Sequence, residues 1–181
     1  MNLPNKLTLA RVIMIVPFLF FLLTDFAGGA SKYIALAIFI IASLTDMLDG
    51  KIARKRNLVT NFGKFMDPLA DKLLVSSALI CFVEMNKLPA WIVVIIISRE
   101  FVISGFRLIA SDNGVVIAAS YWGKIKTTCQ MIMVILLIAD INLAVFEVLE
   151  QVFIYASLAL TVISLVDYLV KNKNVLADGG K

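Results

Sequence analysis

The chain has 181 residues, of which 61% are hydrophobic, and carries a net charge of +4 but no histidine. Its mean hydropathy of +0.94 is too high for an ordinary soluble domain and favours a membrane protein. The lack of histidine excludes zinc hydrolases and triads built on that residue, and the positive charge of a membrane protein favours contact with anionic lipid rather than nucleic acid.

Six apolar stretches follow one another along the chain and predict an all-α integral membrane protein with six transmembrane helices. The predicted spans are residues 7–24, 32–50, 66–85, 89–110, 121–139 and 145–170. The breaks between them contain Gly, Asn, Asp or Pro, which favour turns. Residues 1–181 are predicted to form one domain, with a short interfacial segment at about 1–8 and a polar tail at about 172–181.

Lysine and arginine are distributed unequally between the two ends of the predicted spans. Fifteen of the 17 lie at one set of ends, and only Lys32 and Lys87 lie at the other. Because cytoplasmic loops carry an excess of Lys and Arg, both termini are predicted to be cytoplasmic, which agrees with an even number of spans. The acidic connection that contains Asp140 is then predicted to lie on the outer side.

Four aspartates form a regular pattern around the break between the second and third spans. The pattern is D-x-x-D-G-x-x-A-R, eight residues and G-x-x-x-D-x-x-x-D, with its fixed positions at Asp46, Asp49, Gly50, Ala53, Arg54, Gly63, Asp67 and Asp71. Spacings of three and four place such residues on one face of a helix, and the short connection makes the two helices antiparallel neighbours. Converging carboxylates repel each other unless they hold cations, and acidic residues beside a membrane core usually mark function.

The remaining residues of the pattern suit a metal-bound pyrophosphate. Gly50 and Gly63 allow a ligand to approach the backbone, and Arg54 offers a planar fork to phosphate oxygens. Oxygen ligands favour Mg²⁺, Mn²⁺ or Ca²⁺. The alternative is that these aspartates only cap helices or pair with nearby lysines, but four carboxylates in register with two glycines and an arginine disfavour it.

The pattern resembles the signature of the CDP-alcohol phosphatidyltransferases, and all eight of its positions match. The six-span layout also fits that family. The resemblance implies that Asp46, Asp49 and Asp67 bind one Mg²⁺ (or Mn²⁺) ion, and that Asp46, Asp67 and Asp71 bind a second. It also implies that Asp71 is the general base, that the protein is a homodimer, and that the active site lies at the cytoplasmic ends of the helices, in the cytoplasmic membrane of a bacterium.

The resemblance extends to the substrates. Residues 3–11, 67–72, 98–101 and 123–127 are similar to the bacterial members of the family that use CDP-diacylglycerol and glycerol 3-phosphate. The CDP-diacylglycerol site implied in this way consists of Asn5, Thr8, Gly50, Ala53, Arg54, Thr60 and Gly63. Ala53 is expected to be small because a nucleotide packs against it.

A dianionic acceptor phosphate needs cationic partners on the motif's side of the membrane. Arg107 and Lys124 are the first candidates, followed by Arg99 and Lys126. The alternative for each of them is that it only anchors a helix end or contacts anionic lipid. Arg99 and Glu100 are also expected to be able to pair with neighbours inside the bundle.

The expected reaction is a metal-assisted direct displacement. Asp71 takes the proton from the acceptor hydroxyl, which attacks the phosphorus attached to diacylglycerol and releases CMP and phosphatidylglycerophosphate. Two other functions stay open. One is the same transfer to another acceptor, such as phosphatidylglycerol, serine or inositol phosphate. The other is transport of divalent cations, which is disfavoured because no matching acidic residues lie in the spans toward the opposite face.

Overall fold

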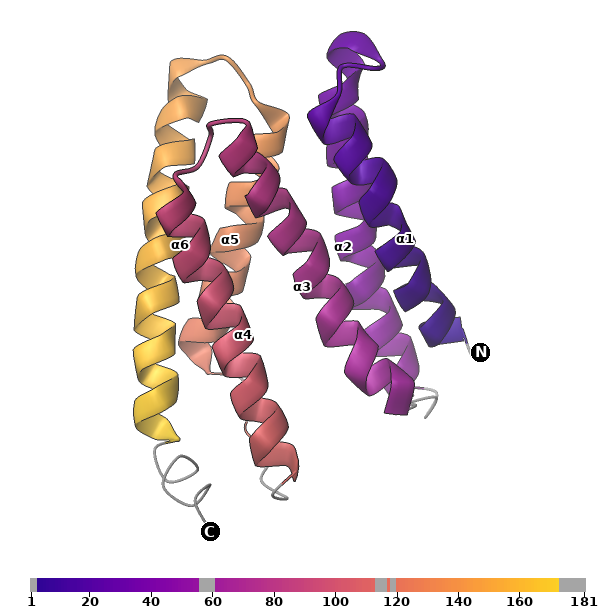
Figure 1. Cartoon of the computed structure of the whole chain (residues 1–181), viewed down its shortest axis with the longest axis vertical. Coiled ribbons are helices and arrows are strands. Elements are labelled where there is room, and N and C mark those ends of the chain that lie inside the picture. Colours follow the sequence, from indigo (N-terminus) through magenta and orange to yellow (C-terminus); the bar gives the residue numbers. More distant parts are fainter. Residues whose placement is uncertain (1–2, 56–60, 113–116, 118–119, 173–181) are drawn as a thin grey trace. The chain divides into compact units, whose positions relative to one another are not determined.

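The structure is a computed structural model that describes the backbone of residues 3–55, 61–112, 117 and 120–172. Side chains are described for the same residues except 3–5, 46–55, 61–68, 71 and 111–112. Every regular element among these residues is a helix (Figure 1). The elements are α1 (Leu3–Leu23), the short 3₁₀ helix η1 (Gly28–Ala30), α2 (Ser31–Lys55), α3 (Asn61–Glu84), α4 (Ala90–Asp112), α5 (Tyr121–Ala139) and α6 (Ala144–Lys171).

These six long helices confirm that each predicted apolar span is helical. The helices α2 and α3 run past the apolar stretches by several residues on either side of their connection, so the aspartate pattern is part of both helices. Residues 3–8, predicted as an interfacial segment, form the first turns of α1. Their position at a membrane interface stays a prediction.

Four of the helical stretches are long and apolar enough to cross a membrane. They are Lys6–Leu23, Gly28–Thr45, Tyr121–Ala139 and Ala144–Lys171. The other two long helices carry more charge, with Asp67, Asp71 and Lys72 in α3 and Arg99, Glu100 and Arg107 in α4. The described residues therefore establish four candidate spans, whereas the six-span count and the cytoplasmic termini stay predictions.

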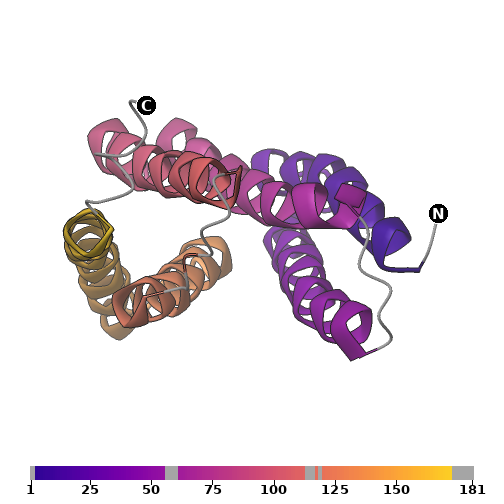
Figure 2. The same cartoon turned by 90° about the horizontal axis from the view of Figure 1, so that it is seen from below.

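The first compact unit contains α1, α2 and α3 together with Leu137–Asp140. Helix α1 packs against both α2 and α3, which also contact each other. Phe18 of α1 and Phe39 of α2 are fully buried, and their ring centroids lie 5.8 Å apart. The C-terminal end of α2 and the N-terminal end of α3 both lie at the lower end of this unit in Figure 1, and Figure 2 views that end from below. The prediction of antiparallel neighbours is thereby confirmed.

The opposite end of the first unit holds an ion-pair group that we call the Asp140 clasp, made of Lys32, Lys87 and Asp140. Lys87 Nζ lies 2.5 Å from Asp140 Oδ1 and donates to Leu137 O at 2.9 Å. Lys32 Nζ donates to Asp140 O at 2.8 Å. The charge count predicts that these three residues share one side of the bundle, and their contacts confirm that they lie together. The side of the membrane that they face stays a prediction.

The second compact unit contains α4, α5 up to Leu136, and α6. Helices α4 and α6 pack against each other, with Ile103, Phe106 and Tyr168 forming a buried cluster. The buried residues of α6 recur every three or four positions, which defines one inward face; they are Ile154, Ser157, Thr161, Ser164 and Tyr168. Three of the five carry small hydroxyl groups, so polar as well as apolar contacts join α6 to its neighbours.

Candidate functional site

The aspartate pattern lies at one end of the first unit. Asp46 and Asp49 lie in the C-terminal half of α2, and Asp67 and Asp71 lie in the N-terminal half of α3. Gly50, Ala53 and Arg54 continue α2, and Gly63 lies in the first turn of α3. The structure thus brings both halves of the pattern to the same end of the unit, although the carboxylates themselves lie outside the described side chains.

The donor chemistry of this pattern fits a divalent cation. Its four acidic residues are all aspartates, and carboxylates are the hard oxygen ligands that Mg²⁺ and Mn²⁺ prefer. Among the described side chains, no group of three or more His, Cys, Asp or Glu could hold a metal ion. The four motif aspartates, which are the predicted metal ligands, have side chains outside this described set.

The predicted donor-site residues outside this pattern lie on α1 and in the α2–α3 connection. Thr8 is fully buried on the inward face of α1, as is Arg11 one turn later. Asn5 belongs to the first turn of α1, but its side chain lies outside the described set. Thr60 lies outside the described residues altogether. Arg11 was not among the predicted site residues, and an arginine that is fully buried in an apolar helix needs polar surroundings.

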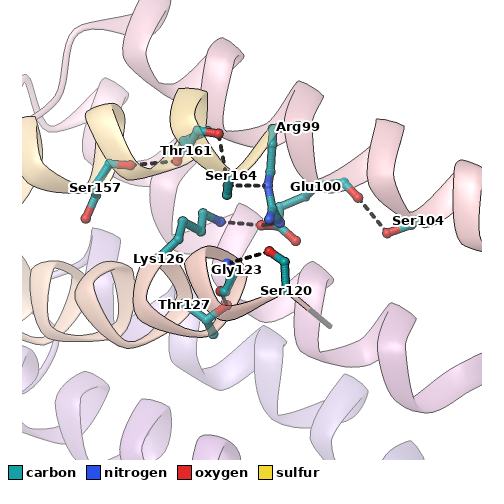
Figure 3. Close-up of polar contacts among 10 residues, drawn as sticks. All are labelled: Arg99, Glu100, Ser104, Ser120, Gly123, Lys126, Thr127, Ser157, Thr161 and Ser164. Atoms are coloured by element: carbon teal, nitrogen blue, oxygen red, sulfur yellow. Dashed lines mark hydrogen bonds and ion pairs between the residues drawn. The ribbon is translucent and has the colours of Figure 1, made fainter. Parts of the chain in front are cut away.

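Two of the four predicted acceptor cations meet in the second unit, in a group that we call the Glu100 network: Arg99, Glu100, Lys126 and Ser164 (Figure 3). Arg99 Nη1 donates to Glu100 Oε1 at 3.1 Å, and Lys126 Nζ donates to the same oxygen atom. Arg99 Nε donates to Ser164 Oγ at 3.1 Å. The network thus joins α4, α5 and α6, and its two cations are only 7% and 1% exposed.

The surroundings of the Glu100 network are polar and locally ordered. Ser164 Oγ donates onward to Thr161 O at 3.0 Å, and Thr161 Oγ1 donates to Ser157 O at 2.6 Å. At the start of α5, Ser120 Oγ accepts a hydrogen bond from Gly123 N at 3.1 Å, which is the usual contact of a helix N-cap. A Cβ at Gly123 would stand 3.4 Å from Arg99 Nη2, so the first turn of α5 lies directly against the guanidinium.

The other two predicted acceptor cations are separate from this network. Arg107 is exposed on α4, and its guanidinium carbon lies 5.8 Å from the centroid of the Tyr168 ring, a cation–π arrangement. Lys124 is exposed in the first turn of α5. The four cations therefore divide into a buried pair held by Glu100 and an exposed pair open to ligands or to lipid headgroups.

Sequence reasoning did not identify Ser164 and did not assign Glu100 a role at the site. Arg99 and Glu100 do pair with neighbours inside the bundle, as the sequence allowed, since Glu100 contacts both Arg99 and Lys126. The available signal for Ser164 was the spacing of Ser157, Thr161 and Ser164, which puts three hydroxyls on one face of an otherwise apolar helix. Such a stripe indicates a polar neighbour, but it does not say which one.

Comparison with known proteins gives consistent matches over nearly the whole chain. Residues 1–163 match the family of CDP-alcohol phosphatidyltransferases. The chain is 49% identical to the CDP-diacylglycerol–glycerol-3-phosphate 3-phosphatidyltransferase of Bacillus subtilis, with 97% of each protein covered. It is 40% identical to the protein of the same name from Haemophilus influenzae, over 98% of this chain and 96% of the relative. It is also 40% identical to a probable phosphatidylglycerophosphate synthase of Mycobacterium tuberculosis, over 94% of this chain and 81% of the relative.

Proposed function

The chain belongs to the CDP-alcohol phosphatidyltransferase family, and from this premise we propose that it transfers a phosphatidyl group from CDP-diacylglycerol to glycerol 3-phosphate. The products are phosphatidylglycerophosphate and CMP. The observation that carries the proposal is the 49% identity with the Bacillus subtilis enzyme across 97% of both chains. A match of this extent covers the segments that hold the aspartate pattern on α2 and α3 and the cationic residues on α4 and α5.

The donor site is proposed to lie at the end of the first unit where α1 and α3 begin and α2 ends. Its residues are Asn5, Thr8, Gly50, Ala53, Arg54, Thr60 and Gly63. Arg54 offers a bidentate contact to phosphate oxygens, and the two glycines permit close approach of the pyrophosphate to the backbone. The acyl chains of the lipid substrate stay in the bilayer, which four helices of the described chain are apolar enough to cross.

A divalent metal is proposed to be held by the motif aspartates. Asp46, Asp49 and Asp67 would hold one Mg²⁺ or Mn²⁺ ion, and Asp46, Asp67 and Asp71 a second. Such ions, when bound, stabilise negative charge on phosphoryl oxygens. The carboxylate donor set and its place on two adjoining helix ends support this assignment.

The protein's own residues are proposed to supply the proton transfer and the positioning of the acceptor. Asp71 takes the proton from the terminal hydroxyl of glycerol 3-phosphate as that oxygen attacks the phosphorus attached to diacylglycerol. Arg107, Lys124, Arg99 and Lys126 bind the acceptor phosphate. The two pairs differ in their surroundings, because Arg107 and Lys124 are exposed whereas Arg99 and Lys126 are held by Glu100.

The membrane arrangement is proposed to comprise six spans, with both termini and the active site on the cytoplasmic side. In α4, the pairing of Arg99 with Glu100 supports a span that carries charge, because the two charges offset each other inside the protein. The resemblance to the family supports a homodimer in the cytoplasmic membrane of a bacterium.

The test is an acceptor screen with the purified protein, CDP-diacylglycerol and Mg²⁺, with CMP release as the readout. Glycerol 3-phosphate is expected to trigger release, whereas serine, inositol phosphate and phosphatidylglycerol are not. Asp71→Asn is expected to lower turnover by about a thousandfold or more while largely sparing nucleotide binding, because only the proton acceptor and one metal ligand oxygen are altered. Release triggered by another acceptor would overturn the substrate assignment, and normal turnover of Asp71→Asn would overturn the assignment of the base.

A further inference from the structure

Glu100 lies between two cationic side chains in the second unit (Figure 3). One of its oxygen atoms, Oε1, accepts from Arg99 Nη1 at 3.1 Å and also from Lys126 Nζ. Arg99 belongs to α4, as does Glu100, whereas Lys126 comes from α5. A single carboxylate oxygen therefore fixes the position of a guanidinium on one helix relative to an ammonium on another.

Two cations that approach the same point repel each other, and the repulsion is strong where water is excluded. The side chains of Arg99 and Lys126 are 9% and 2% exposed, so solvent screens them little. A carboxylate shared between them offsets this repulsion and makes the close placement of the two cations possible. Neutral residues at position 100 lack this effect, because an amide carries no charge.

The pairing also fixes direction. Neighbouring residues on a helix point about 100° apart, so the contact of Arg99 Nη1 with Glu100 Oε1 restricts the side-chain conformations of both residues. Ser164 Oγ holds the guanidinium from α6 by accepting from Nε at 3.1 Å. Glu100 of α4 and Ser164 of α6 together define the orientation of the Arg99 guanidinium. The guanidinium is therefore ordered before any ligand binds.

We propose that Glu100 is a positioning residue that holds Arg99 and Lys126 as a paired cationic group for the phosphate of the acceptor. The inference rests on the proposed function, in which glycerol 3-phosphate is the acceptor. An anion with two negative charges gains most from two cations that are already close and oriented, because binding then costs little side-chain ordering. Glu100 itself acts through the two cations and does not contact the substrate.

The experiment compares steady-state kinetics of the wild type and Glu100→Gln, with both substrates varied in turn. We expect the KM for glycerol 3-phosphate to rise about tenfold or more, while kcat changes less than about threefold and the KM for CDP-diacylglycerol less than about twofold. Equal increases in both KM values, or no increase in either, would overturn the proposal. A lower KM for glycerol 3-phosphate would overturn it as well, because Glu100 would then compete with the phosphate.

Two further variants keep the outcome interpretable. Glu100→Asp retains the charge on a shorter side chain, so its KM for glycerol 3-phosphate is expected to rise by less than that of Glu100→Gln. An unchanged KM in Glu100→Asp would contradict the positioning role. If Glu100→Gln does not fold, Glu100→Asp alone tests the proposal. Asp140→Asn is the matched control, since it removes a carboxylate that also contacts two lysines, and its KM values are expected to stay at wild-type level. If the wild type itself responds to another acceptor only, the proposed function fails, and the same KM comparison with that acceptor tests Glu100 separately.

Discussion

Glu100 and Asp140 each contact two cationic side chains, but the two carboxylates lie in different surroundings. The partners of Glu100 are buried side chains within helices α4 and α5. Asp140 follows the last residue of α5 in a left-handed backbone conformation (φ 47°), and its side chain is 46% exposed. Its partners, Lys32 and Lys87, lie at the start of α2 and in the turn after α3.

The difference indicates what each group contributes. An ion pair open to water contributes about 0–1 kcal/mol and weakens with salt, so the Asp140 clasp is suited to holding helix ends and turns together. A buried pair is different, because well-packed apolar side chains often stabilise a protein equally well in its place. Stability alone therefore does not account for the Glu100 network, and this supports a role in ligand binding.

Removal of one lysine from each group is expected to have the largest effect. Lys126→Met is expected to lower kcat/KM for glycerol 3-phosphate by about thirtyfold or more, because it removes one of the two paired cations. Lys87→Met, an identical change in the clasp, is expected to alter kcat/KM by less than about twofold. Steady-state kinetics on both variants, with melting temperatures as the measure of folding, decide the outcome. Equal losses of activity in the two variants would mean that the Glu100 network has no more to do with function than the Asp140 clasp.

The Asp140 clasp is expected to respond to salt. Asp140→Asn is expected to lower the free energy of unfolding by about 0.5–1 kcal/mol, which corresponds to a decrease of about 2 °C in the melting temperature of a chain of this size. Raising the salt concentration to about 1 M screens exposed charges, so the difference from the wild type is expected to shrink. Melting curves in detergent at low and high salt test this. A difference that persists unchanged at high salt would show that the clasp is effectively buried.

The sequence predicted the helices well because their signal is hydrophobicity, which is local. The turns at residues 25–31, 86–89 and 140–142 were recognisable from Gly, Asn, Asp and Pro, and Asn86 and Asp140 indeed have positive φ. The aspartate pattern was equally easy to recognise in the sequence, since its spacing matches helix geometry and its residues match a known signature. The extension of α2 and α3 into the polar residues beyond their apolar stretches was less so, because those residues carry no apolar signal.

Contacts between distant residues were much harder to predict. Nothing in the sequence couples Arg99 to Ser164, because 65 positions separate them, and the side on which a helix packs is decided by all of its neighbours. The sequence ranked Arg107 and Lys124 above Arg99 and Lys126 as acceptor ligands. The structure adds burial and a shared carboxylate, which distinguish the second pair from cations that only anchor helix ends.

The smallest expected effect belongs to Ser164, which contributes a neutral hydroxyl to the Glu100 network. Ser164→Ala removes the acceptor of Arg99 Nε but leaves the contact with Glu100, so the KM for glycerol 3-phosphate is expected to rise only about two- to fivefold. Ser157→Ala is the matched control, because Ser157 lies on the same face of α6 but donates to Cys129 Sγ at 3.4 Å. That hydrogen bond does not involve a charged group of the Glu100 network. The KM of Ser157→Ala for glycerol 3-phosphate is therefore expected to stay at the wild-type value. If both serine variants behave alike, the hydroxyl face of α6 serves helix packing, and orientation of Arg99 then depends on Glu100 rather than on α6.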